Sequence, residues 1–113
     1  MDPQSEIQAE FEKAELARAR GNEGQARVCA RRAAGIAARE YLSRRGERPR
    51  TSSAYDLLKR IADDRAIPEG LRASAARLTL RVDEEFKLPP DMDLIAEARA
   101  LCAALLSGAA STS

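Results

Sequence analysis

The longest helical pattern in the chain runs from Asn22 to Gly46. Wound at about 100° per residue, this segment gathers its apolar side chains on one half of a cylinder. These side chains are Ala26, Cys29, Ala30, Ala33, Ala34, Ile36, Ala37 and Tyr41. Arginines occupy the other half. We expect a helix of about 23 residues, roughly 35 Å long, whose alanine face lets neighbouring helices approach closely and supply the large core side chains.

Capping residues and apolar spacing predict four further helices. The apolar faces are Ile7, Phe11, Ala14 and Ala17 in the first helix; Ala54, Leu57, Leu58 and Ile61 in the third; Leu71, Ala75, Leu78, Val82 and Phe86 in the fourth; and Leu94, Ala98, Leu101 and Leu105 in the last. Asp2, Asn22, Ser53 and Asp91 are placed as N-caps, Pro68 starts the fourth helix, and Gly21, Gly46 and Gly108 end helices.

These elements predict a single all-α domain. The turn at Gly21 is so short that the first two helices must form an antiparallel hairpin. The sequence has no alternating run rich in Val, Ile and Thr that would indicate a strand. We expect an up-and-down bundle of four main antiparallel helices plus one short helix, formed by residues 1–107, with residues 108–113 as a disordered tail.

Charge is distributed unevenly along the chain, although its net charge is only +1. Residues 1–17 carry one lysine against five acids, and residues 51–113 carry eight basic residues against ten acids. Between them, residues 18–50 carry ten arginines against three acids. This basic segment favours a phosphate-bearing or acidic partner. The alternative is a solvated arginine face whose charges form salt bridges between helices.

The residue types present exclude several kinds of site. The chain has no His, the commonest general base at neutral pH and the commonest metal ligand. Cys29 and Cys102 lie within apolar helical patterns, which favours two reduced, buried thiols over a disulfide. The acidic N-terminus does not resemble a signal peptide, and no apolar run is long enough to span a bilayer. We expect a cytoplasmic protein with no metal, no cofactor and no membrane contact.

An alanine-rich hairpin turns at Gly-Asn and leads into ARRAAGIAAREYL, which is followed by SAYDLL, a further helix and a proline-containing break. Over residues 9–107 this order resembles that of HEPN domains, small helical bundles often encoded beside a minimal nucleotidyltransferase in prokaryotic toxin–antitoxin pairs. Three short segments lie where HEPN domains have recurring motifs. Ala33-Ala34 and Tyr41-Leu42 match an "AA…A…L" signature, and Asp56-Leu57-Leu58 lies where the family often has His-Asp-Leu. Lys87-Leu88-Pro89 lies where many members have Arg-Tyr-Pro. The resemblance implies a homodimer or a complex with a nucleotidyltransferase-type protein.

The chain departs from that family at the catalytic motif. Catalytic HEPN members are ribonucleases that need no metal and use an Arg and a His a few residues apart. Here Lys87 replaces the motif Arg, and no His is present. We therefore expect a non-catalytic binding or assembly module with no catalytic residue. The alternative is a ribonuclease with a non-standard site, in which Arg81 or Lys87 holds phosphate and a carboxylate of residues 83–85 acts as the base.

Two groups of residues are candidate binding sites. The candidate phosphate-binding or nucleic-acid-binding residues are Arg27, Arg31, Arg32 and Arg39 on the second helix, together with Arg81 and Lys87. Because the chain has few aromatic residues for base stacking, we expect any contact with RNA or nucleotide to be electrostatic and weak. The candidate partner interface is Val28, Ala38 and Leu42, apolar residues on the arginine side of the same helix.

Overall fold

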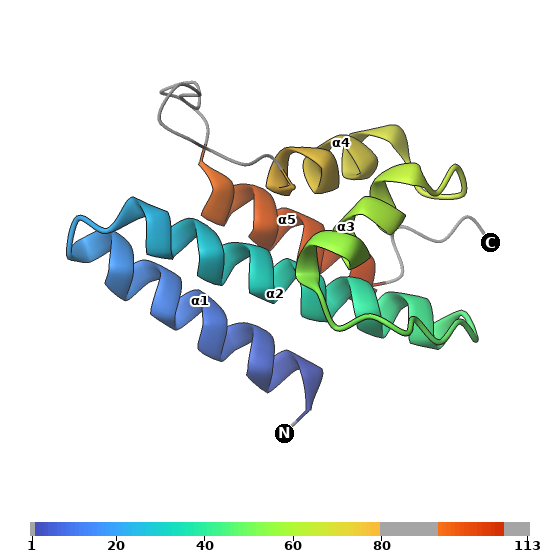
Figure 1. Ribbon diagram of the computed structural model, residues 1–113, viewed down its shortest axis with the longest axis horizontal. Helices are drawn as coiled ribbons and strands as arrows, with labels where there is room; N and C mark the ends of the chain where they lie inside the picture. The colour runs from blue at the N-terminus through green and yellow to red at the C-terminus, as the bar shows by residue number, and fades with distance from the viewer. Residues whose placement is uncertain (1, 80–92, 108–113) are drawn as a thin grey trace.

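The computed structural model describes residues 2–79 and 93–107, and the regular structure within these ranges is helical (Figure 1). The helices are α1 (Pro3–Ala19), α2 (Glu23–Arg44), α3 (Ala54–Asp63), α4 (Glu69–Leu78) and α5 (Leu94–Ser107). The prediction of an all-α fold is therefore confirmed for the described residues. Within them, no helix combines the length and the apolar character needed to cross a membrane.

Most helix ends lie where local chemistry predicts them. The side chains of Asp2, Asn22 and Ser53 accept hydrogen bonds from amides in the first turns of α1, α2 and α3. Gly21 and Gly46 have φ angles of 78° and 82°, the left-handed conformation that glycine adopts most readily after a helix. These predicted caps and stops are confirmed.

The start of α5 differs from the prediction. Asp93 Oδ1 accepts hydrogen bonds from the amides of Ile95 and Ala96, at 3.1 and 3.2 Å, so Asp93 is the residue that caps this helix. The predicted cap, Asp91, lies outside the described residues, as do Val82 and Phe86 of the predicted fourth helix.

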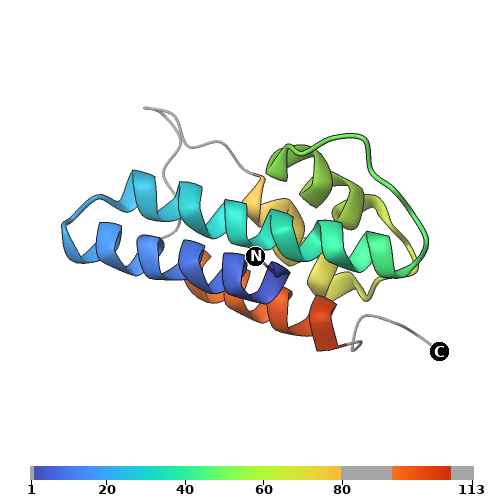
Figure 2. The ribbon, with the colours of Figure 1, turned by 90° about the horizontal axis from the view of Figure 1, so that it is seen from below.

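Helix α2 is the central element of the fold. It packs against α1, α3 and α5, and α4 packs against α3 and α5 (Figures 1 and 2). Helices α1 and α2 form the expected antiparallel hairpin. Arg44 Nη1 at the end of α2 donates to Leu106 O at the end of α5 (2.9 Å), so these two helices run in the same direction. The parallel contact of α2 and α5 means that the expected up-and-down bundle of four main antiparallel helices is not confirmed.

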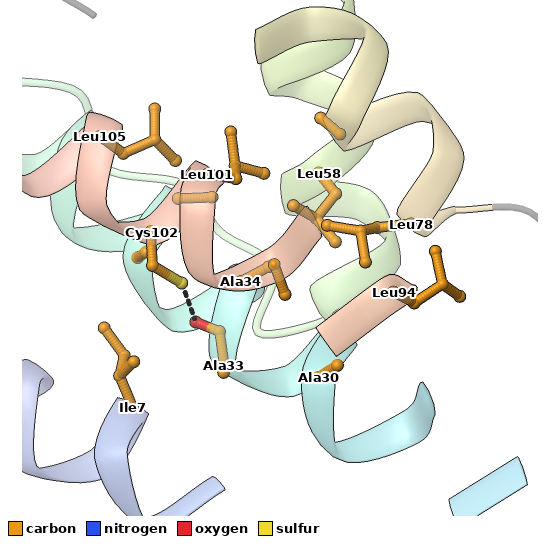
Figure 3. Packing of buried hydrophobic residues seen from close by; sticks show 14 of the residues in the cluster. Ile7, Ala30, Ala33, Ala34, Leu58, Leu78, Leu94, Leu101, Cys102 and Leu105 are labelled. Atoms are coloured by element: carbon orange, nitrogen blue, oxygen red, sulfur yellow. Dashed lines mark hydrogen bonds between the residues drawn. The ribbon is translucent and has the colours of Figure 1, made fainter. Parts of the chain in front are cut away.

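The core is built from small side chains of α2 and large side chains of its neighbours, as predicted. Ala30, Ala33 and Ala34 are completely buried, and Cys102 Sγ of α5 donates to Ala33 O at 3.6 Å (Figure 3). The largest fully buried side chains from the other elements are Leu58, Ile61, Ile67, Leu78, Leu101 and Leu105. Each such side chain contributes roughly 1.5–3 kcal/mol of burial free energy.

The buried part of α2 is wider than the half-cylinder expected from its sequence. Ala38 and Leu42 are 0% exposed, because three helices contact α2 from different directions. The sequence pattern placed these two residues of the candidate partner interface on the exposed arginine side of the helix, and that placement is wrong. Both lie in the core of the chain itself. Val28, the third residue of that group, is half-buried.

An ion-pair network joins the hairpin to α5. Arg18 of α1 contacts Glu23 at 2.8 Å and Asp93 at 3.0 Å. The hydrogen bond from Arg18 lowers the pKa of Asp93 below its usual value, and partial burial opposes that shift. Asp93 therefore has two roles, since it caps α5 and anchors α5 to the end of α1.

Candidate functional site: a groove between three helices

A groove of about 680 Å³ lies between α1, α2 and the start of α3. Pockets of roughly 300–1,000 Å³ hold small organic ligands in other proteins. Its lining consists of Glu6 and Glu10 from α1; Val28, Arg31, Arg32, Gly35, Ile36 and Arg39 from α2; and Ser52, Ala54 and Leu57 at the start of α3. We call this hollow the α1–α2–α3 groove. It contains three of the four α2 arginines that the sequence indicates as phosphate ligands.

Arg32 and Arg39 are the two groove arginines whose charge is not compensated within the described chain. Both side chains are exposed, and neither makes an ion pair or hydrogen bond with a described residue. They lie two helical turns apart on the same side of α2, about 10.5 Å along the helix axis. Arg39 also lines an adjoining hollow of about 500 Å³ that contains Arg48. Arg39 therefore lies between the groove and the loop after α2.

Arg31 differs from its neighbour Arg32, although both line the groove. Arg31 Nε donates to Leu78 O at 2.7 Å, and Leu78 is the last residue of α4. A helix C-terminus carries unpaired carbonyls and a partial negative charge, so a guanidinium group stabilises it. Arg31 thus has a structural role in holding the end of α4 against α2. Arg27 is half-buried and does not line the groove.

Gly35 sets the position of α3, and with it one end of the groove. An added Cβ on Gly35 would lie 2.7 Å from Ala54 Cβ and 2.8 Å from Ala54 Cα, so only glycine permits this approach. Ala54 is the first residue of α3, and the preceding residue, Ser53, caps the helix. The crossing brings the N-terminus of α3, with its partial positive charge, to the groove beside Ser52.

The sequence did not indicate the wall of the groove that lies opposite the arginines. Glu6 and Glu10 face the groove from α1, and no ion pair joins either of them to Arg32 or Arg39. The Glu10 side chain is only 15% exposed, and its Oε1 is buried without a hydrogen-bond partner in the described chain. The available signal was the spacing of the two acids, one helical turn apart beside Ile7, which places both at the edge of the buried face of α1.

Arg81 and Lys87 lie outside the described residues. Among the residues that are described, no cluster of acids and cysteines has the arrangement needed to hold a metal ion.

Both cysteines have free thiols and are buried, as predicted. Cys102 lines a separate hollow of about 340 Å³ that α1 and α5 share. Burial raises the pKa of its thiol to about 12, so the thiol remains protonated at neutral pH. Since the thiolate is the nucleophilic form of cysteine, Cys102 is not an activated nucleophile in this structure.

The α1–α2–α3 groove therefore combines two arginines and a carboxylate oxygen that have no partner among the described residues with an apolar floor and a helix N-terminus. Comparison with known proteins gave no match to any protein-family model, curated protein or solved structure. The functional interpretation of this chain accordingly depends on the geometry and electrostatics of its own groove.

Proposed function

We propose that this chain is a non-catalytic, all-helical binding module, and that it binds a phosphate-bearing ligand in the α1–α2–α3 groove. The observation that carries the proposal is the pair Arg32 and Arg39, which have no partner within residues 2–79 and 93–107 and lie beside an apolar floor. Guanidinium groups form two parallel hydrogen bonds with phosphate oxygens, and such charge-assisted bonds are worth roughly 1.5–3 kcal/mol each.

The helical position of these arginines favours ligand binding over a general solvated surface. Both side chains project from the central helix, whose backbone is fixed by packing on three sides. Little backbone ordering is therefore needed when a phosphate binds between them, which improves affinity. Two other arginines of the same helix have internal partners: Arg31 binds the end of α4, and Arg44 binds Leu106 O.

The absence of histidine supports a binding role over catalysis, since the chain lacks the usual general base at neutral pH. The resemblance to HEPN domains adds a partner to the proposal, either a nucleotidyltransferase-type protein or a second copy of this chain. Such an assembly would use a surface other than Ala38 and Leu42, because these residues are buried in the core. RNA and nucleotides are the phosphate sources that the resemblance suggests.

The test is a titration of ¹⁵N-labelled protein with inorganic phosphate and pyrophosphate at low ionic strength. We expect shift changes at the groove residues of α2 and at the start of α3. In the variant Arg32→Gln/Arg39→Gln, affinity should fall at least tenfold.

The matched control is Arg27→Gln, which removes an arginine of the same helix that lies off the groove. This variant should bind as the unchanged protein does. Equal losses in the control and in the double variant would indicate a non-specific effect of net charge and would overturn the assignment. Absence of any binding by the unchanged protein would also overturn it.

A further inference from the structure

The carboxylate of Glu10 makes fewer hydrogen bonds than its burial requires. Oε1 is shielded from solvent and has no donor in the described chain, and the contact of Oε2 with Lys13 Nζ is long, at 3.9 Å. Lys13 itself is 62% exposed, so this pair is a weak surface contact. A buried acceptor without a donor destabilises the free protein, because the acceptor has lost its hydrogen bonds to water and gained none in return. Glu10 is one of the residues that line the groove, so a hydroxyl donor on a bound ligand would supply the missing hydrogen bond.

The two walls of the groove carry opposite charges and remain apart. Arg32 and Arg39 lie on α2, whereas Glu6 and Glu10 lie on α1, with no ion pair between the two sets. A long polyanion such as RNA would place some of its phosphates near the glutamates, and like charges at short range repel each other. A ligand with one anionic group and a neutral body carrying hydroxyl groups matches both walls at once.

The floor between the walls is suited to the carbon skeleton of such a ligand. Val28, Ile36 and Leu57 contribute apolar surface there. Small-molecule sites commonly combine an apolar lining with a few polar groups that fix the orientation of the ligand. In this groove the arginines would fix the phosphate end, and Glu10 would fix the hydroxyl end.

We infer that the ligand of the α1–α2–α3 groove is a small phosphorylated polyol, whose phosphate pairs with Arg32 and Arg39 and whose hydroxyl group donates to Glu10. This inference rests on the proposed phosphate-binding function and adds to it the class of ligand. Glu10 selects the ligand, while the arginines provide the charge attraction.

The test compares two phosphate monoesters that differ only in hydroxyl groups, glycerol 3-phosphate and propyl phosphate. Calorimetric titrations at one ionic strength give the dissociation constants of both, with inorganic phosphate and a 12-nucleotide single-stranded RNA as further probes. We expect glycerol 3-phosphate to bind about tenfold more tightly than propyl phosphate, the effect of one hydrogen bond to a charged group.

The variant Glu10→Met removes the acceptor and keeps a side chain of similar length that favours helix. It should weaken glycerol 3-phosphate about tenfold and leave propyl phosphate unchanged or slightly tighter, because a negative charge near the phosphate is lost. A loss of affinity for glycerol 3-phosphate alone cannot arise from partial unfolding, which would weaken the binding of both monoesters. Glu12→Met, which alters an exposed acid of α1 that does not line the groove, is the matched control and should change neither affinity.

The outcomes distinguish the two levels of the proposal. Equal affinity for the two monoesters, or an equal response of both to Glu10→Met, would overturn the polyol inference and leave phosphate binding intact. Tighter binding of the RNA than of glycerol 3-phosphate would also overturn the inference and would indicate a nucleic-acid ligand. If inorganic phosphate and both monoesters fail to bind, the proposed function itself fails.

Discussion

Replacement of Gly35 by alanine gives the sharpest test of how α3 is positioned on α2. The new Cβ would lie 2.7 Å from Ala54 Cβ and 2.8 Å from Ala54 Cα, where ordinary contacts begin at 3.4 Å. The start of α3 must therefore move by about 0.7 Å, the difference between 2.7 and 3.4 Å. Because one of the clashing atoms belongs to the backbone, a change of side-chain rotamer cannot relieve the contact.

Two effects of opposite sign decide the stability of this variant. Alanine in a helix interior is more favourable than glycine by roughly 1 kcal/mol. Overpacking in a closely packed interior typically costs about 1–3 kcal/mol. We expect the cost of overpacking to offset the helix-propensity gain or exceed it, which leaves a net loss of up to about 2 kcal/mol in the free energy of unfolding. Urea titration followed by circular dichroism at 222 nm measures this difference.

Gly24→Ala is the matched control, since it makes the same substitution in the same helix. The nearest atom to its new Cβ is Asn22 Oδ1 at 3.8 Å, an ordinary contact. This variant should be unchanged or more stable by up to about 1 kcal/mol. If Gly35→Ala raises the stability as much as Gly24→Ala does, the close crossing of α2 and α3 is refuted, and with it the shape of the groove.

Three further predictions concern the core, the ion pairs and the thiols. Leu42→Ala should lower the free energy of unfolding by about 2–5 kcal/mol, the usual cost of truncating a buried leucine. If Leu42 were on the surface, the same substitution would change that free energy by less than about 0.5 kcal/mol. Urea titration distinguishes the two results. Because the folded-state pKa of Asp93 is lowered by Arg18, its ion pair stabilises the fold above the unfolded pKa of about 4 and is lost as pH falls through the lower folded value. Asp93→Asn should accordingly flatten the loss of stability on acidification from about pH 5, and an acid titration with the same slope in both proteins would contradict this account. Cys102, whose thiol has a pKa of about 12, should react with a thiol reagent at pH 8 only after urea unfolds the protein, and rapid labelling of the native state would refute its burial.

The candidate site could be predicted only in part, and the adjacent pair Arg31 and Arg32 shows the reason. Both residues belong to the polar half of one helix, and helical periodicity gives them similar roles. The position of α4 provides Arg31 with the carbonyl of Leu78, whereas Arg32 remains in the groove without a partner in the described chain. Side chains about 100° apart on a helix can face different neighbours, and those neighbours come from distant parts of the sequence.

The acidic wall of the groove also could not be predicted from the sequence. Glu6 and Glu10 are ordinary polar residues of an amphipathic helix when the sequence is considered alone. They become part of a site only because α1 packs beside α2, with α3 closing one end of the space.

The sequence by itself determined the local elements: which segments form helices, most of their caps and glycine stops, and the small-residue face of α2. These features depend on residues within a few positions of each other, so helical periodicity and capping chemistry are sufficient to predict them. Only the tertiary structure decided that α2 has three neighbours, which buries Ala38 and Leu42 and places α5 parallel to α2. The tertiary structure also decided that a groove exists, because its walls come from three helices whose relative positions depend on long-range packing.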